Sequence, residues 1–118
     1  MPDDAATVLD IVLACRRIAR FVADADEKSF LADDEKHWAV VSQLMLIGEA
    51  VRRLSTDFCD QHSSIPWHQM AGMRNRLVHH YDKIDWPLVW TTACRNVPIL
   101  LAALEPQVLN VQDDEIEM

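Results

Sequence analysis

Apolar residues recur every three or four positions in four stretches of the chain, a spacing that places them on one face of an α-helix. The pattern predicts helices from about residue 5 to 22, from 33 or 34 to about 58, from 66 to at least 78, and from 85 to about 104. The four apolar stripes are Val8, Ile11, Val12, Cys15, Ile18, Ala19 and Val22; Val40, Leu44, Ile47, Val51, Leu54 and Phe58; Trp67, Met70, Arg74 and Leu77; and Trp90, Cys94, Val97, Leu101 and Leu104. The chain is therefore predicted to be all-α.

Local signals set the ends of these helices. Aspartates precede three of them and can accept hydrogen bonds from the free N–H groups of the first turn; they are Asp3 or Asp4, Asp33 or Asp34, and Asp85. Before the third helix, Ser64 or Ile65 is the expected cap, with Pro66 in the first turn. Pro98 is expected to kink or split the last helix, because it removes a backbone hydrogen bond to residue 94.

Two further expectations concern packing. Gly48 lies in the middle of the second helix, where glycine is up to about 1 kcal/mol less favourable than alanine. A physical reason to keep it is the close approach of another backbone. Its neighbour Glu49 can pair with Arg52 three positions on, or it is an ordinary surface carboxylate. After a polar connector over residues 24–29, Phe30 and Leu31 are expected to turn into the core.

Length and composition indicate one domain. The chain has 118 residues, half of them hydrophobic and only 2 of them glycine, which favours helices over sheets. Residues 1–106 are predicted to form one bundle and residues 107–118 an acidic tail. No apolar run reaches the roughly 18 residues of a membrane span, and the acidic N-terminus is unlike a signal peptide. Three cysteines without a CxxC spacing (Cys15, Cys59 and Cys94) are typical of small buried residues in a reducing cytosol, so a cytoplasmic location is expected.

The formal net charge is −8, from 11 Lys and Arg against 19 Asp and Glu. Proteins that bind nucleic acid without specificity are usually basic, so the charge counts against that class. It leaves room for a local basic cleft, because the positive residues are clustered. The clusters are Arg16, Arg17 and Arg20; Arg52 and Arg53; and Arg74, Arg76 and Lys83. Each is equally compatible with an ordinary solvated helix face.

Residues 71–82 carry the densest group of candidate functional side chains, with Arg74, His79 and Tyr81 in an Arg-x4-His-x-Tyr pattern. A guanidinium can bind two phosphate oxygens at once, and an imidazole can take up and return a proton near neutral pH. This set suits chemistry on phosphate esters.

On a straight helix Arg74 and His79 point about 140° apart. They converge only if the helix ends near His79 or if two copies of the segment face each other in a symmetric dimer. Asn75 shares a helix face with His79.

The same residues have plainer interpretations. An Arg and a His on an amphipathic helix usually mark a solvated surface, and the Arg-x4-His spacing alone is a weak signal. Arg74 falls on or beside the apolar stripe, which places it at an interface or next to a buried acid. His62 and His68 lack a Cys partner for a metal site, and Gly is too scarce for a phosphate-binding loop. Neither a metal nor a cofactor is expected.

With these motifs in view, the chain resembles the HepT toxins of the HEPN superfamily. The matching segments are Ile47-Gly48-Glu49-Ala50, Pro66-Trp67, Gly72-Met73-Arg74-Asn75, His79-x-Tyr81 and Val89-Trp90. The pattern Met-Arg-Asn-x-x-x-His-x-Tyr after Pro-Trp is far more specific than Arg-x4-His alone. The likeness runs from the first predicted helix to about residue 104, and the tail beyond Pro106 is unmatched.

The resemblance implies an antiparallel up-and-down bundle of four to five helices that forms a symmetric homodimer, with both Arg-x4-His motifs in a shared cleft. It implies a metal-independent ribonuclease in which Arg74 holds the phosphate of RNA and His79 transfers protons. The supporting or substrate-contacting residues would be Glu49, Asn75, Arg76 and His80. It also implies a type VII toxin–antitoxin system, whose MntA-like nucleotidyltransferase antitoxin transfers AMP to Tyr81. The alternatives are a non-catalytic adaptor subunit of a nucleotidyltransferase and a purely structural bundle.

Overall fold

A computed structural model of the chain describes residues 3–108, which form helices and turns and no strand. The α-helices are α1 (Asp4–Val22), α2 (Glu27–Leu31), α3 (Asp34–Arg53), α4 (Thr56–Gln61), α5 (Trp67–His79), α6 (Trp86–Thr91) and α7 (Val97–Leu104). A π-helical turn (Thr92–Asn96) joins α6 to α7, and 3-10 turns follow α5 (Tyr81–Lys83) and α7 (Glu105–Val108). The predicted all-α class is confirmed. The expected acidic tail lies outside the described residues from position 109 onward.

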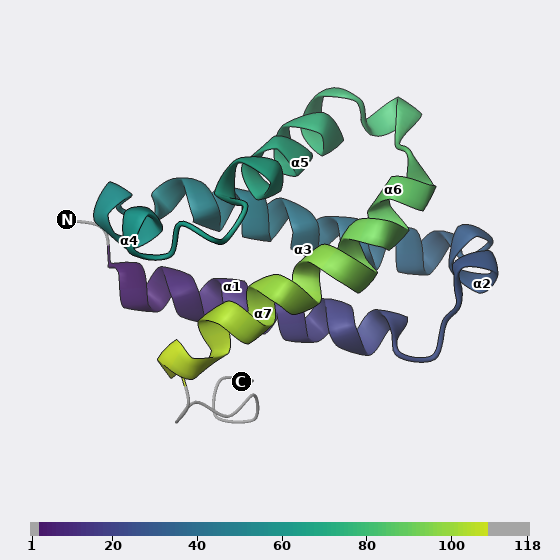
Figure 1. The fold of residues 1–118 in the computed structure, drawn as a ribbon. Coiled ribbons are helices and arrows are strands. Elements are labelled where there is room, and N and C mark those ends of the chain that lie inside the picture. The colour runs from purple at the N-terminus through teal and green to yellow at the C-terminus, as the bar shows by residue number, and fades with distance from the viewer. Residues whose placement is uncertain (1–2, 109–118) are drawn as a thin grey trace.

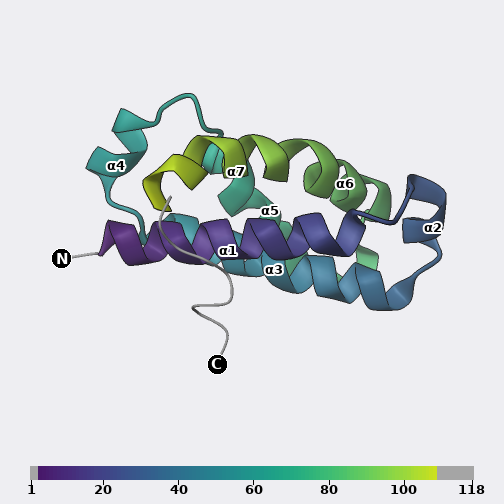
Figure 2. The ribbon, with the colours of Figure 1, turned by 90° about the horizontal axis from the view of Figure 1, so that it is seen from below.

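Helices α1 and α3 run antiparallel, side by side, and form the base of the molecule (Figure 1). Helix α5 packs on α3 and α7 packs on α1, so both cover the same side of this base (Figure 2). Side chains from all four helices fill the core between these layers. Its fully buried members include Ile11, Val12 and Ile18 of α1, Val40, Leu44 and Ile47 of α3, and Val97, Leu100 and Leu104 of α7, with Met70, Met73 and Leu77 of α5 beside them.

The second helix is shorter than predicted. Helix α3 ends at Arg53, Leu54 takes an extended backbone, and α4 begins after Ser55. The Ser55 hydroxyl accepts the N–H of Phe58 at 3.1 Å and donates to the Asp4 carboxylate at 2.6 Å, while the Ser55 N–H donates to the same carboxylate at 2.9 Å. These bonds give the chain an alternative to the helical ladder, so the prediction of one helix reaching Phe58 is wrong.

Most predicted helix starts are confirmed. Asp3, Asp33 and Asp85 each accept an N–H from the first turn of the helix that follows. Helix α5 has Pro66 before it and no side-chain cap, so the assignment of Ser64 or Ile65 as a cap is wrong. Phe30 is fully buried as predicted, whereas Leu31 is 40% exposed because the short helix α2 turns it outward.

The last helix is split next to Pro98, as predicted. The π-helical turn closes with the Val97 N–H bonded to the Thr92 carbonyl, directly before the proline. Taken as one run, residues Trp86–Val108 have the length and mean hydropathy, 1.2, of a helix that could cross a membrane. A core helix passes the same test, and this run places Val89 and Leu100 in the core at 1% exposure each. The run thus passes the test of length and hydropathy and also contributes side chains to the core.

The cysteines differ in their surroundings. Cys15 lies in the core, where burial raises the pKa of its thiol to about 12, with a further contribution from the charge of Glu105. Cys59 and Cys94 are only partly buried. The expectation of buried cysteines therefore holds for Cys15 alone.

Candidate functional site

Helix α5 crosses α3 at Gly48, and this crossing places Arg74. A Cβ atom added at Gly48 would overlap the Cβ of Arg74 and lie 3.1 Å from the carbonyl oxygen of Met70. Only glycine therefore lets the backbone of α5 and the stem of Arg74 lie against α3. The expectation of a close approach at Gly48 is confirmed, and the approaching group is the base of the candidate phosphate-binding side chain.

The guanidinium of Arg74 is held by a neighbour on α3. Its Nε lies 3.1 Å from Oε2 of Glu49, and the two side chains are 26% and 48% exposed. Its Nη1 donates a long hydrogen bond of 3.4 Å to Oδ1 of Asn75, while Nη2 has no hydrogen-bond partner within residues 3–108. Of the two interpretations of Glu49, the surface carboxylate agrees with its exposure, and its ionic partner is Arg74 and not Arg52. The acid next to Arg74 is half-exposed and not buried. The pair fixes the Nε edge and leaves the Nη2 end available.

His79 is the last residue of α5 and is exposed. Because it is still helical, its backbone keeps the divergence of about 140° from Arg74 that the helical period dictates. Asn75 is also exposed and shares the face of His79. Within the described residues, contacts join Arg74 to Glu49 and Asn75, and none joins His79 to that group. Helix α5 thus ends at His79, which is one of the two conditions under which the sequence allows Arg74 and His79 to converge, and no contact joins the two side chains within the described residues.

Tyr81 starts the 3-10 turn that follows α5 and is 68% exposed. It is the most exposed of the large hydrophobic and aromatic side chains in the described part of the chain. Its phenol is thus accessible from outside, as modification by another protein would require.

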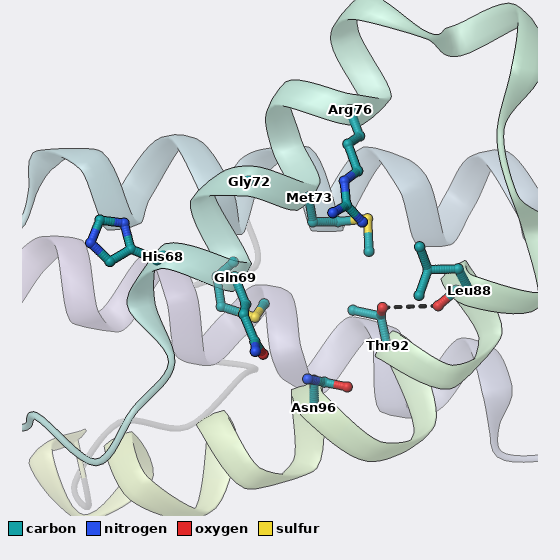
Figure 3. Close-up of a pocket in the computed structure, with 9 residues that line it drawn as sticks. His68, Gln69, Gly72, Met73, Arg76, Leu88, Thr92 and Asn96 are labelled. Atoms are coloured by element: carbon teal, nitrogen blue, oxygen red, sulfur yellow. Dashed lines mark hydrogen bonds between the residues drawn. The ribbon is translucent and has the colours of Figure 1, made fainter.

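Arg76 and His80 lie on a different face of α5 from Arg74. Together with Met73, Arg76 lines two adjoining cavities between α5 and α6, of about 470 and 170 Å³, and His80 lines the smaller one. Figure 3 shows the Arg76 side chain lying along Met73 and pointing toward α6. The larger cavity is also lined by Gln69 and Asn96, which the sequence analysis did not single out. The signal that could have found them is Gly72, a second mid-helix glycine on this face.

A metal-binding cluster is not formed by the described residues: no group of three or more His, Cys, Asp or Glu side chains comes together between positions 3 and 108.

Comparison with known proteins gives a consistent picture. A family model described as "Ribonuclease HepT-like" matches residues 11–106. A protein of Methanocaldococcus jannaschii named "Putative RNase" is 31% identical over 96% of this chain and 93% of its own length. A second M. jannaschii protein, whose name also begins "Putative RNase", is 33% identical over 87% of this chain and 94% of its own length. A Thermococcus cleftensis protein named "Probable ribonuclease HepT" is 35% identical over 81% of this chain and 87% of its own. No solved structure gives a significant match.

Proposed function

The chain belongs to the ribonuclease HepT-like family, and we propose that it is the toxin of a type VII toxin–antitoxin pair: a metal-independent endoribonuclease whose site is shared by two copies in a symmetric homodimer. The family supports ribonuclease activity in general and an RNA substrate. The observation that carries the more specific proposal is the Arg74–Glu49 pair beside Gly48, because it holds a guanidinium with its Nη end directed away from its partner.

A phosphodiester is the group that such a guanidinium suits. Two Nη donors match two non-bridging phosphate oxygens, and a half-buried Arg is less screened than one in bulk water. Glu49 accepts a hydrogen bond from Nε only. It therefore orients the guanidinium and leaves the Nη groups on the opposite edge able to bind a phosphate. Arg74 would therefore bind the scissile phosphate and stabilise the negative charge that builds up on it.

The placement of His79 supports a dimeric site. His79 is exposed, remains helical, and diverges from Arg74 on the same chain. A two-fold axis beside the ends of both α5 helices would bring Arg74 of one subunit next to His79 of the partner subunit. Asn75, on the His79 face, would orient the imidazole or contact the phosphate.

The proposed reaction uses the nucleophile that RNA carries itself. His79 takes the proton of the 2′-hydroxyl, the 2′-oxygen bonds to phosphorus, and the bond from phosphorus to the 5′-oxygen breaks. The protonated imidazole, or its symmetry mate, returns a proton to the leaving 5′-oxygen. The products are a 2′,3′-cyclic phosphate and a 5′-hydroxyl, and the reaction consumes no water, oxidant or metal ion.

The exposed phenol of Tyr81 supports the regulatory half of the proposal. An MntA-like nucleotidyltransferase would act as antitoxin by transferring AMP to this hydroxyl, in the cytoplasm, where ATP is available. The added nucleotide brings bulk and a negative phosphodiester two residues from His79. It would exclude an RNA phosphate by occlusion and like-charge repulsion.

Purified protein incubated with RNA in excess EDTA tests the function. We expect cleavage to continue in EDTA, with 2′,3′-cyclic phosphate ends detected by mass spectrometry. Replacing the RNA by its 2′-O-methyl form should stop cleavage, because the nucleophile is blocked. RNA that stays intact with the wild-type protein would instead favour the adaptor function, in which the chain only presents a surface to the nucleotidyltransferase.

A further inference from the structure

A groove separates α5 from the α6–α7 run, on the opposite side of α5 from Arg74. Its larger cavity, about 470 Å³, is within the range of roughly 300–1,000 Å³ usual for small-ligand sites. Figure 3 shows the amide groups of Gln69 on α5 and Asn96 on the π-helical turn facing each other across this space. Met70 and Met73 give the cavity an apolar wall.

The polar groups that line the cavity are largely unused within the chain. Thr92 is an exception, because its hydroxyl donates to the Leu88 carbonyl at 2.9 Å. The side chains of Gln69, Asn96 and Arg76 make no hydrogen bond with any residue between positions 3 and 108. Two amides and a guanidinium that converge without partners supply both donors and acceptors to a ligand.

Gly72 gives an independent reason to expect an occupant. A Cβ added there would meet nothing within 4 Å, in contrast to Gly48. Glycine inside a helix is roughly 0.5–1 kcal/mol less favourable than alanine, and no packing within the described chain requires it here. Gly72 lines the groove, so its missing side chain widens the space available to something outside the fold.

Charge identifies the kind of occupant. No carboxylate lines the larger cavity, and the adjoining smaller one contains Arg76, His80 and Lys83. Its single acid is Asp85, whose carboxylate already accepts the Leu88 N–H at 3.1 Å to cap α6. The groove is thus locally positive in a chain of net charge −8. A ligand with a planar, hydrogen-bonding part suits the amides of the larger cavity, and an anionic group on the same ligand suits the positive residues of the smaller one.

We propose that the α5–α6 groove binds one nucleotide of single-stranded RNA, with the base between Gln69 and Asn96 and a phosphate at Arg76. Side-chain amides recognise base edges through paired donors and acceptors, and unpaired RNA bases can leave the strand to enter such pockets. Arg76 lies two residues from Arg74 but on the opposite side of α5, so a strand held here would have to cross this helix to reach the proposed cleavage site. The proposal rests on the RNA substrate of the proposed function and adds a subsite that selects and positions the strand.

The test is NMR observation of the Gln69 and Asn96 side-chain NH₂ groups, assigned with the Gln69→Ala and Asn96→Ala variants. The probes are the four nucleoside 5′-monophosphates and 2′-O-methyl tetranucleotides, which cannot be cleaved through the 2′-oxygen. The resonances of both amides should shift on titration.

Gly72→Leu, which fills open space and favours the helix, and Arg76→Ala should each weaken binding about tenfold or more. Gln61→Ala and Arg95→Ala, which remove an amide and a guanidinium outside the groove, should leave it unchanged.

Two results would overturn the subsite. One is binding that leaves both amides unshifted or is unaffected by Gly72→Leu and Gln69→Ala. The other is a Gly72→Leu protein that binds normally but loses its dimer in light scattering, which would make the groove a contact between copies. The proposed function is judged separately, on cleavage of unmodified RNA. Cleavage of RNA without amide shifts would contradict the subsite and leave the ribonuclease proposal standing. Amide shifts without cleavage would contradict the ribonuclease proposal and leave the subsite standing.

Discussion

The two mid-helix glycines, Gly48 on α3 and Gly72 on α5, have opposite surroundings. Gly48 is required because α5 and the stem of Arg74 occupy the space where its side chain would be, whereas Gly72 faces open space. Sequence alone could flag both as unfavourable inside a helix. It could not say which of them is packed, because the neighbour of Gly48 comes from a helix 26 positions away.

Gly48→Ala should destabilise the fold despite the better helix propensity of alanine. The added methyl group meets backbone and Cβ atoms that cannot rotate away, so α5 must move, at an expected net cost of about 1–3 kcal/mol in the free energy of unfolding. The matched control, Gly72→Ala, should stabilise the fold by about 0.5–1 kcal/mol. Urea unfolding of both variants measures this difference. Equal effects of the two substitutions would contradict the described helix crossing.

Glu49 is predicted to act as a positioning residue for Arg74. Glu49→Ala frees the guanidinium and should lower kcat/KM for RNA about tenfold, while Glu49→Gln should retain most activity, because its amide oxygen can still accept from Nε. Stability should change little, since the pair is half-exposed. Asp10→Ala, which breaks the exposed Arg53–Asp10 pair, is the control. An inactive Glu49→Gln would mean that the carboxylate itself transfers protons.

At the scale of helices, the contact between Asp4 and Ser55 ties the start of α1 to the break between α3 and α4. The Ser55 hydroxyl, and secondarily its N–H, lower the pKa of the Asp4 carboxyl below 3.8. A lowered pKa means that the stabilisation is fully present above the unfolded-state value and is lost as the pH falls through the folded-state value. The bond should therefore stabilise the fold at neutral pH and fail in acid.

Asp4→Asn should lower the urea midpoint at about pH 6, and the gap to wild type should close as the pH drops below about 3.8. Asp24→Asn changes an exposed carboxylate outside the α3–α4 junction and serves as the control. A gap that stays constant down to about pH 2 would show that the Asp4 charge does not support the α3–α4 junction.

The helices that sequence placed well are those with strong local signals. Aspartate caps and the Trp86–Pro87 start are confirmed, as is the split at Pro98, because each depends on residues a few positions apart. The end of α3 was missed because the apolar stripe continues through Leu54 to Phe58, and the break depends on a hydrogen bond to Asp4, 51 positions away. Local periodicity carries no information about such a partner.

At the scale of the whole molecule, the sequence identified the residues of the Arg-x4-His-x-Tyr motif but not the partners of Arg74 on other helices. The 140° divergence of Arg74 and His79 followed from the helical period alone, and the exposed, helical His79 agrees with it. The Glu49–Arg74 pair and the groove lined by Gln69 and Asn96 require the packing of α5 against α3 and its separation from α6. Their partners lie on different helices, which spacing within one helix cannot reveal.

Tyr81 is predicted to be the residue to which a nucleotidyltransferase antitoxin transfers AMP. Tyr81→Phe should cleave RNA at the wild-type rate, because the hydroxyl has no part in the proposed chemistry, but should escape neutralisation. Intact mass after incubation with the nucleotidyltransferase, ATP and Mg²⁺ should show added AMP on wild type only. Equal AMP addition to both proteins would move the modification elsewhere, and an inactive Tyr81→Phe would place the phenol in the catalytic site.

We propose that Arg74 of one subunit and His79 of the partner subunit form one ribonuclease site. Arg74→Ala and His79→Ala should each lower cleavage about 100-fold or more while remaining dimeric and helical. His80→Ala, which removes the adjacent imidazole on another face, should be much milder.

The most direct measurement is RNA cleavage in EDTA by a mixture of the Arg74→Ala and His79→Ala proteins, unfolded and refolded together. Random pairing makes half of the dimers mixed. Each mixed dimer has one intact site, formed by the wild-type Arg74 of one subunit and the wild-type His79 of the other, where a wild-type dimer has two. Activity should therefore return to about a quarter of the wild-type level. If the site lay within one chain, neither subunit of a mixed dimer would hold both residues. A refolded mixture as inactive as its two components, beside an active wild type, would contradict the shared site.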